Sequence, residues 1–231
     1  MIVSIIIPCY NEEKTIREII QRIIKVKLDN ITKEIIIVND GSTDKTVSIV
    51  NSLYKQKHII LLSHKKNLGK GAAIKTGIKA SSGEIILIQD ADLEYSPSDY
   101  ASLIRPIIRK KFKVVYGSRE LKRTNREYSY LVFYWGGLLV TKVANFLYGT
   151  KLTDVPTGYK VFDSTIIKQI HLRSNGFEFC PEVTAKIARL NIPIKEVPVK
   201  YTPRSLEEGK KISWRDGLVA IWTLVKYRFV D

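Results

Sequence analysis

The chain of 231 residues contains few cysteines, histidines and methionines. Its two cysteines, Cys9 and Cys180, lie far apart, and the three histidines form no cluster with them. A zinc site needs closely spaced Cys and His ligands, and a disulfide scaffold in a small secreted protein needs many cysteines. The sequence therefore argues against both and predicts two reduced thiols in a cytosolic protein.

Low-complexity segments and internal repeats are also missing, and we expect no secretory leader. The first residues, Ile2 to Pro8, already have the composition of a strand and lack the basic, apolar and small-residue regions of a signal peptide. We therefore expect that the chain is not secreted. Its length and apolar content of 45% are sufficient for the core of one α/β domain, and we expect a single domain over residues 1–231.

Acidic residues are scarce relative to basic ones, 23 against 38, which gives a formal net charge of +15. Such an excess favours anionic partners, namely nucleic acid, anionic lipid or phosphorylated substrates. A generally lysine-rich composition is the alternative. Since no compact nucleic-acid-binding motif is visible and the basic residues are spread along the chain, we expect no nucleic-acid partner.

Short apolar segments alternate with helical patterns in the first half of the chain. Strands are predicted at Val3–Ile7, Glu34–Asn39, Ile59–Ser63, Glu84–Gln89 and Val114–Gly117. Helices are predicted at Asn11–Lys25, Asp44–Lys55, Gly69–Ala80 and Pro97–Lys110. Nearly continuous apolar strands separated by helices are typical of an α/β fold, with a mostly parallel, doubly wound sheet and helices on both faces.

An acidic pair follows the fourth predicted strand, and ligands of such sheets gather at the carboxyl ends of the strands. Asp90 and Asp92 are separated by one residue. Two carboxylates this close repel each other unless a cation or a proton lies between them. Because Mg²⁺ and Mn²⁺ prefer oxygen ligands, the sequence predicts a divalent metal site at Asp90 and Asp92, with Glu94 as a third donor.

Two other strand ends carry candidate nucleotide contacts. Asp40 follows the second strand, where an acid can accept hydrogen bonds from a ribose or a base; an Asx-turn completed by Gly41 is the alternative. Lys70 lies in Asn67-Leu-Gly-Lys-Gly71, which opens a helix, and helix N-termini attract phosphate. The spacing does not match a P-loop, and a helix start without a ligand is an equal alternative.

The second half of the chain is richer in aromatic residues. The segment 128–149 is apolar but interrupted by Gly136, Gly137 and Lys142. An amphipathic helix lying on a membrane surface fits it better than a membrane span, and a core helix is the alternative. Trp214–Phe229 combines Trp, Tyr and Lys, which favour the headgroup region, so it predicts a second surface-seeking helix or a helix docked on the domain.

Eight motifs follow one another in an order and spacing that resemble family 2 inverting glycosyltransferases of the GT-A fold. The first four are Pro8-Cys-Tyr-Asn-Glu12, Val38-Asn-Asp-Gly-Ser-Thr-Asp44, Asn67-Leu-Gly-Lys-Gly71 and Gln89-Asp-Ala-Asp-Leu-Glu94. The others are Ser118-Arg119, Leu152-Thr-Asp-Val-Pro-Thr-Gly-Tyr-Lys160, Gly176-Phe-Glu-Phe179 and Arg204-Ser-Leu-Glu-Glu-Gly-Lys-Lys-Ile-Ser-Trp214. More narrowly, the chain resembles polyprenyl (dolichyl) phosphate mannose and glucose synthases.

The resemblance implies a role for each matching residue. The nucleotide-binding residues would be Pro8, Tyr10, Glu12, Asp40, Lys70 and Asp90. The ligands of Mg²⁺ or Mn²⁺ would be Asp90, Asp92 and Glu94, although close relatives often carry Gln at the last position. The phosphate-handling residues would be Arg119, Arg204 and Lys211, and the catalytic residues would be Asp92, Arg119 and Arg204. The segment Tyr201–Trp214 resembles a basic loop that closes on the substrates.

The implied reaction transfers mannose or glucose, from GDP-mannose or UDP-glucose, to a polyprenyl or dolichyl phosphate with inversion. Residues 1–120 would bind the nucleotide-sugar and residues 121–231 the acceptor. A phosphate acceptor is largely anionic at neutral pH, so it needs cationic positioning, whereas a hydroxyl acceptor would need a base such as Glu178 or Glu182. The alternatives are a soluble or polysaccharide acceptor, or a non-catalytic nucleotide-binding adaptor of a membrane complex.

The expected location follows from the same resemblance. Many relatives carry C-terminal transmembrane helices, and this sequence ends at Asp231 without one. The resemblance therefore implies peripheral contact with the cytoplasmic face of a membrane, directly or through a membrane-anchoring partner protein. Anionic lipids in that leaflet would attract each nearby Lys or Arg by roughly 1 kcal/mol.

Overall fold

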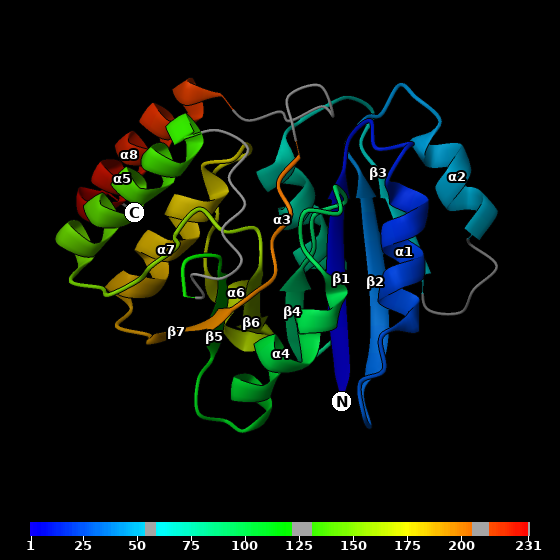
Figure 1. Ribbon diagram of the computed structural model, residues 1–231, viewed down its shortest axis with the longest axis horizontal. Coiled ribbons are helices and arrows are strands. Elements are labelled where there is room, and N and C mark those ends of the chain that lie inside the picture. The colour runs from blue at the N-terminus through cyan, green and yellow to red at the C-terminus, as the bar shows by residue number, and fades with distance from the viewer. Residues whose placement is uncertain (54–58, 122–130, 205–212, 231) are drawn as a thin grey trace.

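The computed structural model describes residues 1–53, 59–121, 131–204 and 213–230 (Figure 1). The strands are β1 (Ile2–Cys9), β2 (Thr32–Asn39), β3 (Ile59–Ser63), β4 (Ile85–Ile88), β5 (Val114–Ser118), β6 (Lys160–Asp163) and β7 (Ile194–Pro198). The helices are α1 (Ile16–Lys25), α2 (Thr46–Leu53), α3 (Lys70–Ala80), α4 (Tyr100–Ile108), α5 (Leu131–Tyr148), α6 (Ser164–Gln169), α7 (Phe179–Arg189) and α8 (Trp214–Phe229), with a 3₁₀ turn η1 (Pro97–Asp99).

The described strands form one mixed sheet in the order β3-β2-β1-β4-β6-β5-β7. Strands β1, β2, β3 and β4 pair in parallel, as do β5 and β7. Strand β6 is antiparallel to both of its neighbours, β4 and β5. The predicted α/β class with a mostly parallel sheet is therefore confirmed. Strands β6 and β7 were not predicted, because they contain charged residues and are not continuously apolar as β1 to β5 nearly are.

Helices cover both faces of the sheet (Figure 1). Helices α1, α2 and α4 pack on one face, and α3 and α5 to α8 pack on the other. Alternate residues of β1 enter the two cores, Ile5 and Ile7 on the first face and Ile6 on the second. Since successive side chains of a strand point to opposite faces, burial on both sides explains why this strand is apolar throughout.

Helix α1 begins at Ile16 rather than at Asn11 as predicted. Asn11 has a positive φ of 52°, a left-handed conformation that a right-handed helix does not contain. Its side-chain oxygen accepts a hydrogen bond of 2.8 Å from the backbone N–H of Thr43. The residues after β1 therefore form a polar turn that is tied to the residues after β2.

The apolar stretch of the second half forms α5, which packs against α7 and α8. Val140 and Ala144 face the core, and the hydroxyl of Tyr148 donates a 2.6 Å hydrogen bond to the carbonyl oxygen of Leu224 in α8. Within the part of the chain that the structure describes, no helix combines the length and the apolar character needed to cross a membrane. The interpretation of 128–149 as a span thus finds no support in the described segment.

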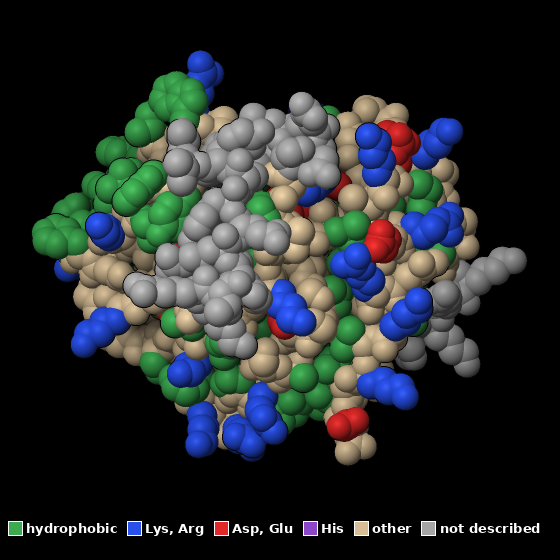
Figure 2. Space-filling view, viewed as in Figure 1, with side chains coloured by type: hydrophobic (Ala, Val, Ile, Leu, Met, Phe, Trp, Pro, Cys, Tyr) green, Lys and Arg blue, Asp and Glu red, His purple; other side chains and the backbone are tan. Residues whose placement is uncertain are grey.

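The outer surfaces of α5 and α8 are apolar. Phe146 on α5 is 88% exposed and Trp222 on α8 is 65% exposed. Figure 2 shows hydrophobic side chains gathered over the edge formed by these two helices, whereas Lys and Arg are scattered across the rest of this view. Both helices are therefore docked on the domain and also present apolar side chains outward.

Candidate functional site

A cavity of about 630 Å³ lies where the polar loops after β1, β2, β4 and β5 meet the N-terminal parts of α5 and α8. The predicted site residues that line it are Pro8, Tyr10, Glu12, Asp40, Lys70, Asp90, Asp92, Glu94, Arg119 and Arg204. Lys211 lies outside the described residues. The structure thus brings the other predicted residues to one place, and the ligand that each contacts stays a prediction.

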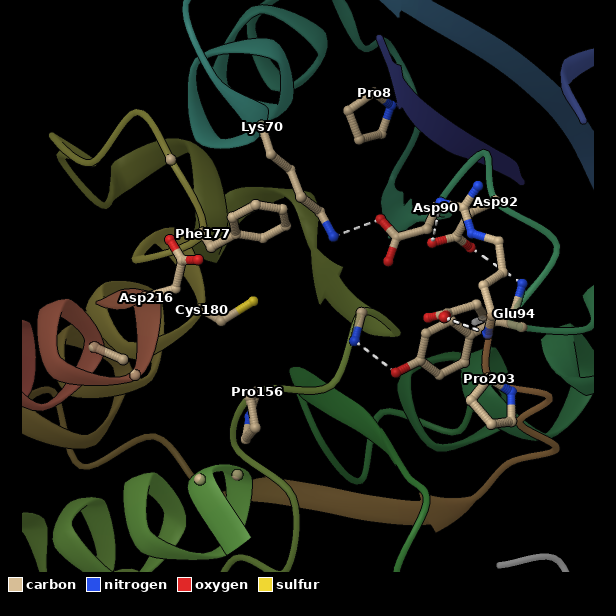
Figure 3. Close-up of a pocket in the computed structure, with 18 of the residues that line it drawn as sticks. Pro8, Lys70, Asp90, Asp92, Glu94, Pro156, Phe177, Cys180, Pro203 and Asp216 are labelled. Atoms are coloured by element: carbon tan, nitrogen blue, oxygen red, sulfur yellow. Dashed lines mark hydrogen bonds and ion pairs between the residues drawn. The ribbon is translucent and has the colours of Figure 1, made fainter. Parts of the chain in front are cut away.

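The acidic pair enters the cavity directly after β4 (Figure 3). Asp90 Oδ1 lies 2.6 Å from Lys70 Nζ, and Asp92 Oδ2 lies 3.5 Å from Arg204 Nη2. Burial, together with the negative charges of Asp90 and Glu94, raises the pKa of Asp92 to about 7. The two neighbouring cations therefore leave Asp92 short of full charge compensation, and a further cation at this pair would stabilise its ionised form.

Lys70 is the first residue of α3 and points across the cavity toward Asp90 (Figure 3). Its ammonium nitrogen also lies 5.7 Å from the ring centre of Phe177. Burial alone would lower the pKa of Lys70, but the charge of Asp90 outweighs it and the pKa is raised. Lys70 is therefore a fixed cation in the cavity wall.

Asp40 supports the loop that carries Lys70. Its carboxylate accepts hydrogen bonds from the backbone N–H groups of Leu68 and Gly69, at 2.9 and 2.7 Å. Asp40 Oδ1 also lies 2.7 Å from Nδ1 of His64, the residue that directly follows β3. These contacts make Asp40 a loop-forming residue in the cavity wall, and its contact with a ribose or base stays a prediction.

Arg204 reaches the acidic pair from the segment that follows β7. Its terminal nitrogens donate to Glu12 Oε2 and Oε1 at 3.1 and 3.3 Å, although 192 residues separate the two in the chain. Its backbone N–H donates to Glu94 Oε1 at 2.8 Å, and the hydroxyl of Tyr201 donates to Glu94 Oε2 at 3.0 Å. Glu12 and Glu94 therefore hold this arginine against the site.

The contacts of Glu94 bear on the predicted metal site. Both of its carboxylate oxygens accept hydrogen bonds from the segment after β7. In the described parts of the chain, no three His, Cys, Asp or Glu side chains gather in an arrangement that would hold a metal ion. Asp90 and Asp92 thus remain as adjacent oxygen donors, and a ligand role for Glu94 would require it to release its present partners.

Arg119 follows β5 and pairs with Asp154. Its Nε and Nη2 donate to the two Asp154 oxygens at 2.7 and 2.6 Å. Its guanidinium carbon lies 5.0 Å from the ring centre of Tyr201. A guanidinium has five N–H donors, and the pair with Asp154 uses two, so Arg119 has further donors for an anion. The sequence analysis did not identify Asp154 as its partner.

The two acids that were considered as bases for a hydroxyl acceptor both bind the backbone of the turn 173–176. Glu182 accepts hydrogen bonds of 2.8 and 2.7 Å from the first two N–H groups of this turn. Glu178 accepts bonds of 3.1 and 3.0 Å from the last two. Glu182 is fully buried. These contacts favour the alternative that both acids stabilise the local structure.

Gly158 is a site residue whose importance the sequence did not reveal. A Cβ atom at this position would lie 2.2 Å from Asp90 Oδ2, which is closer than atoms approach in proteins. The backbone of Gly158 therefore packs directly behind the acidic pair. The only signal in the sequence was its place within the motif that ends at Lys160.

Comparison with known sequences shows which proteins this chain is similar to. Residues 4–170 match the profile described as Glycosyl transferase family 2. The chain is 32% identical over 233 residues to the UDP-N-acetylglucosamine–dolichyl-phosphate N-acetylglucosaminyltransferase of Methanococcus voltae, covering 91% of this chain and 90% of that protein. It is 31% identical over 216 residues to a dolichyl-phosphate beta-glucosyltransferase of Trichomonas vaginalis, covering 86% of this chain and 65% of that one.

Solved structures share the fold. Glucosyl-3-phosphoglycerate synthase from Mycobacterium tuberculosis, in complex with Mn²⁺, UDP and phosphoglyceric acid, superposes with a TM-score of 0.74 at 19% identity, covering 99% of this chain and 79% of that one. A complex of the same protein with Mg²⁺ and UDP also gives a TM-score of 0.74. The predicted GT-A fold is thereby confirmed. From the profile match over most of its length and the identity to the Methanococcus protein, the chain belongs to glycosyl transferase family 2.

Proposed function

We propose that this chain transfers a hexose from a nucleoside diphosphate sugar to the phosphate of a polyprenyl lipid, with inversion, at a membrane surface. The observation that carries the proposal is the composition of the cavity. Asp90, Asp92, Arg119 and Arg204 meet in it, and its opposite wall consists of α5 and α8 with their outward apolar side chains. Two relatives, which are 32% and 31% identical to this chain, are named for transfer to dolichyl phosphate.

The acidic pair fits a divalent cation. Its oxygen donors are those that Mg²⁺ and Mn²⁺ prefer. Burial, together with the charges of Asp90 and Glu94, raises the pKa of Asp92, so a bound cation would favour the ionised form of this carboxylate. Asp90 and Asp92 would hold the ion, which would supply Lewis-acid neutralisation of the leaving diphosphate. Lys70, 2.6 Å from Asp90, would direct a second positive charge at the same diphosphate.

The arginines would position the acceptor phosphate. A phosphate monoester is already largely ionised at neutral pH, so the site must orient it rather than deprotonate it. Arg119 and Arg204 are each held by a carboxylate, Asp154 and Glu12, and a guanidinium fork suits phosphate oxygens. Attack from the face opposite the diphosphate inverts the anomeric centre. The engagement of Glu178 and Glu182 in a local turn is consistent with an acceptor that needs no base.

The helical wall would receive the lipid. The N-terminal parts of α5 and α8 contribute Tyr134, Gly136, Trp214 and Gly217 to the cavity. The apolar outer face of these helices would rest on the cytoplasmic surface of a membrane, where tryptophan favours the interface. In this proposal residues 1–120 bind the donor and residues 121–231 bind the acceptor. A membrane-anchoring partner protein would strengthen the contact with the membrane, and a co-purification experiment would detect it.

A donor screen tests the proposal. Radiolabelled GDP-mannose, UDP-glucose and UDP-N-acetylglucosamine would each be incubated with a short polyprenyl phosphate and Mn²⁺. We include the third donor because the Methanococcus relative is named for it. We expect label from one donor in the lipid phase, and its loss on chelation of the metal. Transfer to a soluble sugar acceptor, with none to the lipid, would contradict the proposal.

A further inference from the structure

A buried polar residue lies directly behind the acidic pair. Gln89 is fully buried, and its amide nitrogen donates a 2.9 Å hydrogen bond to the carbonyl oxygen of Asp90. Its amide oxygen accepts hydrogen bonds of 2.8 Å from the hydroxyls of Tyr100 and Tyr159. Buried polar groups cost stability unless each is paired, and an aliphatic residue would fill this space without that requirement. We therefore interpret this hydrogen-bond network as fixing the position of the Asp90 backbone and the Tyr159 ring rather than as adding stability.

Aromatic rings connect this amide to the arginine side of the cavity. The ring of Tyr159 lies 4.7 Å from that of Tyr95, which lies 5.2 Å from that of Tyr201. The guanidinium of Arg119 stacks on Tyr201 at 5.0 Å. The three rings thus form a continuous column from Gln89 to Arg119, and aromatic pairs at these distances are mutually attractive.

The column also contacts the groups that hold Asp90 and Glu94 in place. The hydroxyl of Tyr95 accepts a 3.0 Å hydrogen bond from the backbone N–H of Gly158, whose backbone packs against Asp90 Oδ2. The hydroxyl of Tyr201 donates to Glu94, which in turn holds the backbone of Arg204. A shift of any ring would therefore move the acidic pair and the arginines relative to each other.

We propose that Gln89, Tyr159, Tyr95 and Tyr201 form a positioning column that sets the separation between the donor-binding acids and the phosphate-binding arginines. This inference rests on the proposed function. Transfer in one step requires reacting atoms about 3–3.5 Å apart, and a misplacement of 1 Å can cost about 100-fold in rate. Gln89 and Tyr159 act through their neighbours, since neither is among the residues that line the cavity.

The chain offers a matched pair of variants. Tyr159→Phe and Tyr100→Phe each remove one fully buried hydroxyl that donates to the same oxygen of Gln89. Of the two rings, only that of Tyr159 contacts Tyr95, so Tyr159→Phe removes the hydrogen bond that joins the column to Gln89 while keeping the ring contact. Tyr100 meets the column only edge-on, through Tyr159 at 6.1 Å. We expect similar decreases in melting temperature for the two variants. We expect kcat to fall about tenfold in Tyr159→Phe, with the donor KM changed less than about twofold, whereas Tyr100→Phe keeps kcat within about twofold of wild type.

Equal kcat values for the two variants, with equal losses of stability, would overturn the column and leave Gln89 a purely structural residue. Tyr95→Phe gives a second test, because it frees the N–H of Gly158 behind Asp90. It should weaken binding of Mn²⁺ with the nucleoside diphosphate in calorimetry several-fold, and unchanged binding would count against the column. If wild-type protein uses another acceptor, the proposed function fails alone, and the two variants are compared with that acceptor.

Discussion

The two walls of the cavity are built in opposite ways. One wall is formed by the loops after β1, β2 and β4 and by the start of α3, and we call it the donor wall because the proposed function assigns it to the donor. Its charged side chains are held by partners, as Asp40 is by loop N–H groups and Lys70 is by Asp90. On the helical wall small residues leave space, and outside its own stretch of helix a Cβ atom at Gly136 or Gly217 would meet no described atom within 4 Å. This difference matches the proposed function, in which a charged donor binds one wall and an apolar lipid chain binds the other.

The largest effect is expected at the acidic pair. Asp92→Ala should reduce transfer by at least about 100-fold, since a Lewis acid contributes several kcal/mol and each 1.36 kcal/mol is tenfold in rate. It should not lower the melting temperature greatly, because the raised pKa shows that the ionised carboxylate is costly in its buried position. A radiolabel assay measures the transfer rate, and thermal unfolding measures the melting temperature. Asp29→Ala, an exposed acid, is the control, and retained transfer in Asp92→Ala would refute the assigned role.

The next largest effect is expected where the two walls meet. Arg204→Ala should lower kcat by about 100-fold and change donor affinity far less, because the arginine is assigned to the acceptor phosphate. Arg204→Lys should recover only part of the rate, since lysine keeps the charge and loses the bidentate fork that pairs with Glu12. Steady-state kinetics with the lipid acceptor and calorimetry with the nucleotide separate the two quantities. Equal losses in both would place Arg204 on the donor wall.

A smaller effect is expected from Lys70, which already compensates Asp90. Lys70→Met should tighten the binding of Mn²⁺ alone by about tenfold, because a competing cation 2.6 Å from Asp90 is removed. The same variant should weaken binding of the nucleotide-sugar, since the diphosphate loses a positive charge. Titrations with the metal alone and with the nucleotide-sugar test both directions. Changes of the same sign in the two titrations would show that Lys70 does not mediate between them.

The smallest effect is expected on the outer face of the helical wall. Replacing Phe146 and Trp222, which are 88% and 65% exposed, with serine should reduce flotation with anionic vesicles several-fold. At a membrane surface each side chain leaves water only in part, so it contributes well under the about 1.5–3 kcal/mol of full burial. Ile24→Ser on α1 is the control, since Ile24 is 37% exposed on a helix outside this wall. Unchanged flotation would remove the support for a membrane-facing surface.

The donor wall was largely predictable from sequence, and the reason is topological. Its strands are apolar, and its charged residues follow the carboxyl ends of parallel strands. Predicting where such a strand ends therefore also predicts that the next residues lie at the ligand-binding edge of the sheet. Asp90 and Asp92 needed no long-range information. The wall formed by α5 and α8 was predicted as helices. Strands β6 and β7 next to it were missed because charged residues interrupt their short apolar segments, Lys-Val-Phe-Asp and Ile-Lys-Glu-Val-Pro.

The partners of the charged residues were not predictable from the sequence. Arg204 and Glu12 are 192 residues apart, and Arg119 and Asp154 are 35 residues apart. Such pairs depend on the finished fold. The same holds for Gln89, whose neighbours Tyr100 and Tyr159 come from separate elements.

The most direct test of the account compares polyprenyl phosphate with the corresponding polyprenol as acceptor, under identical donor and Mn²⁺ concentrations. In the proposed mechanism Arg119 and Arg204 orient an already ionised phosphate, and no base is needed. This mechanism therefore predicts labelled lipid with the phosphate and none above background with the alcohol. Comparable transfer to the alcohol would contradict it, because the site would then have to remove a proton from a hydroxyl.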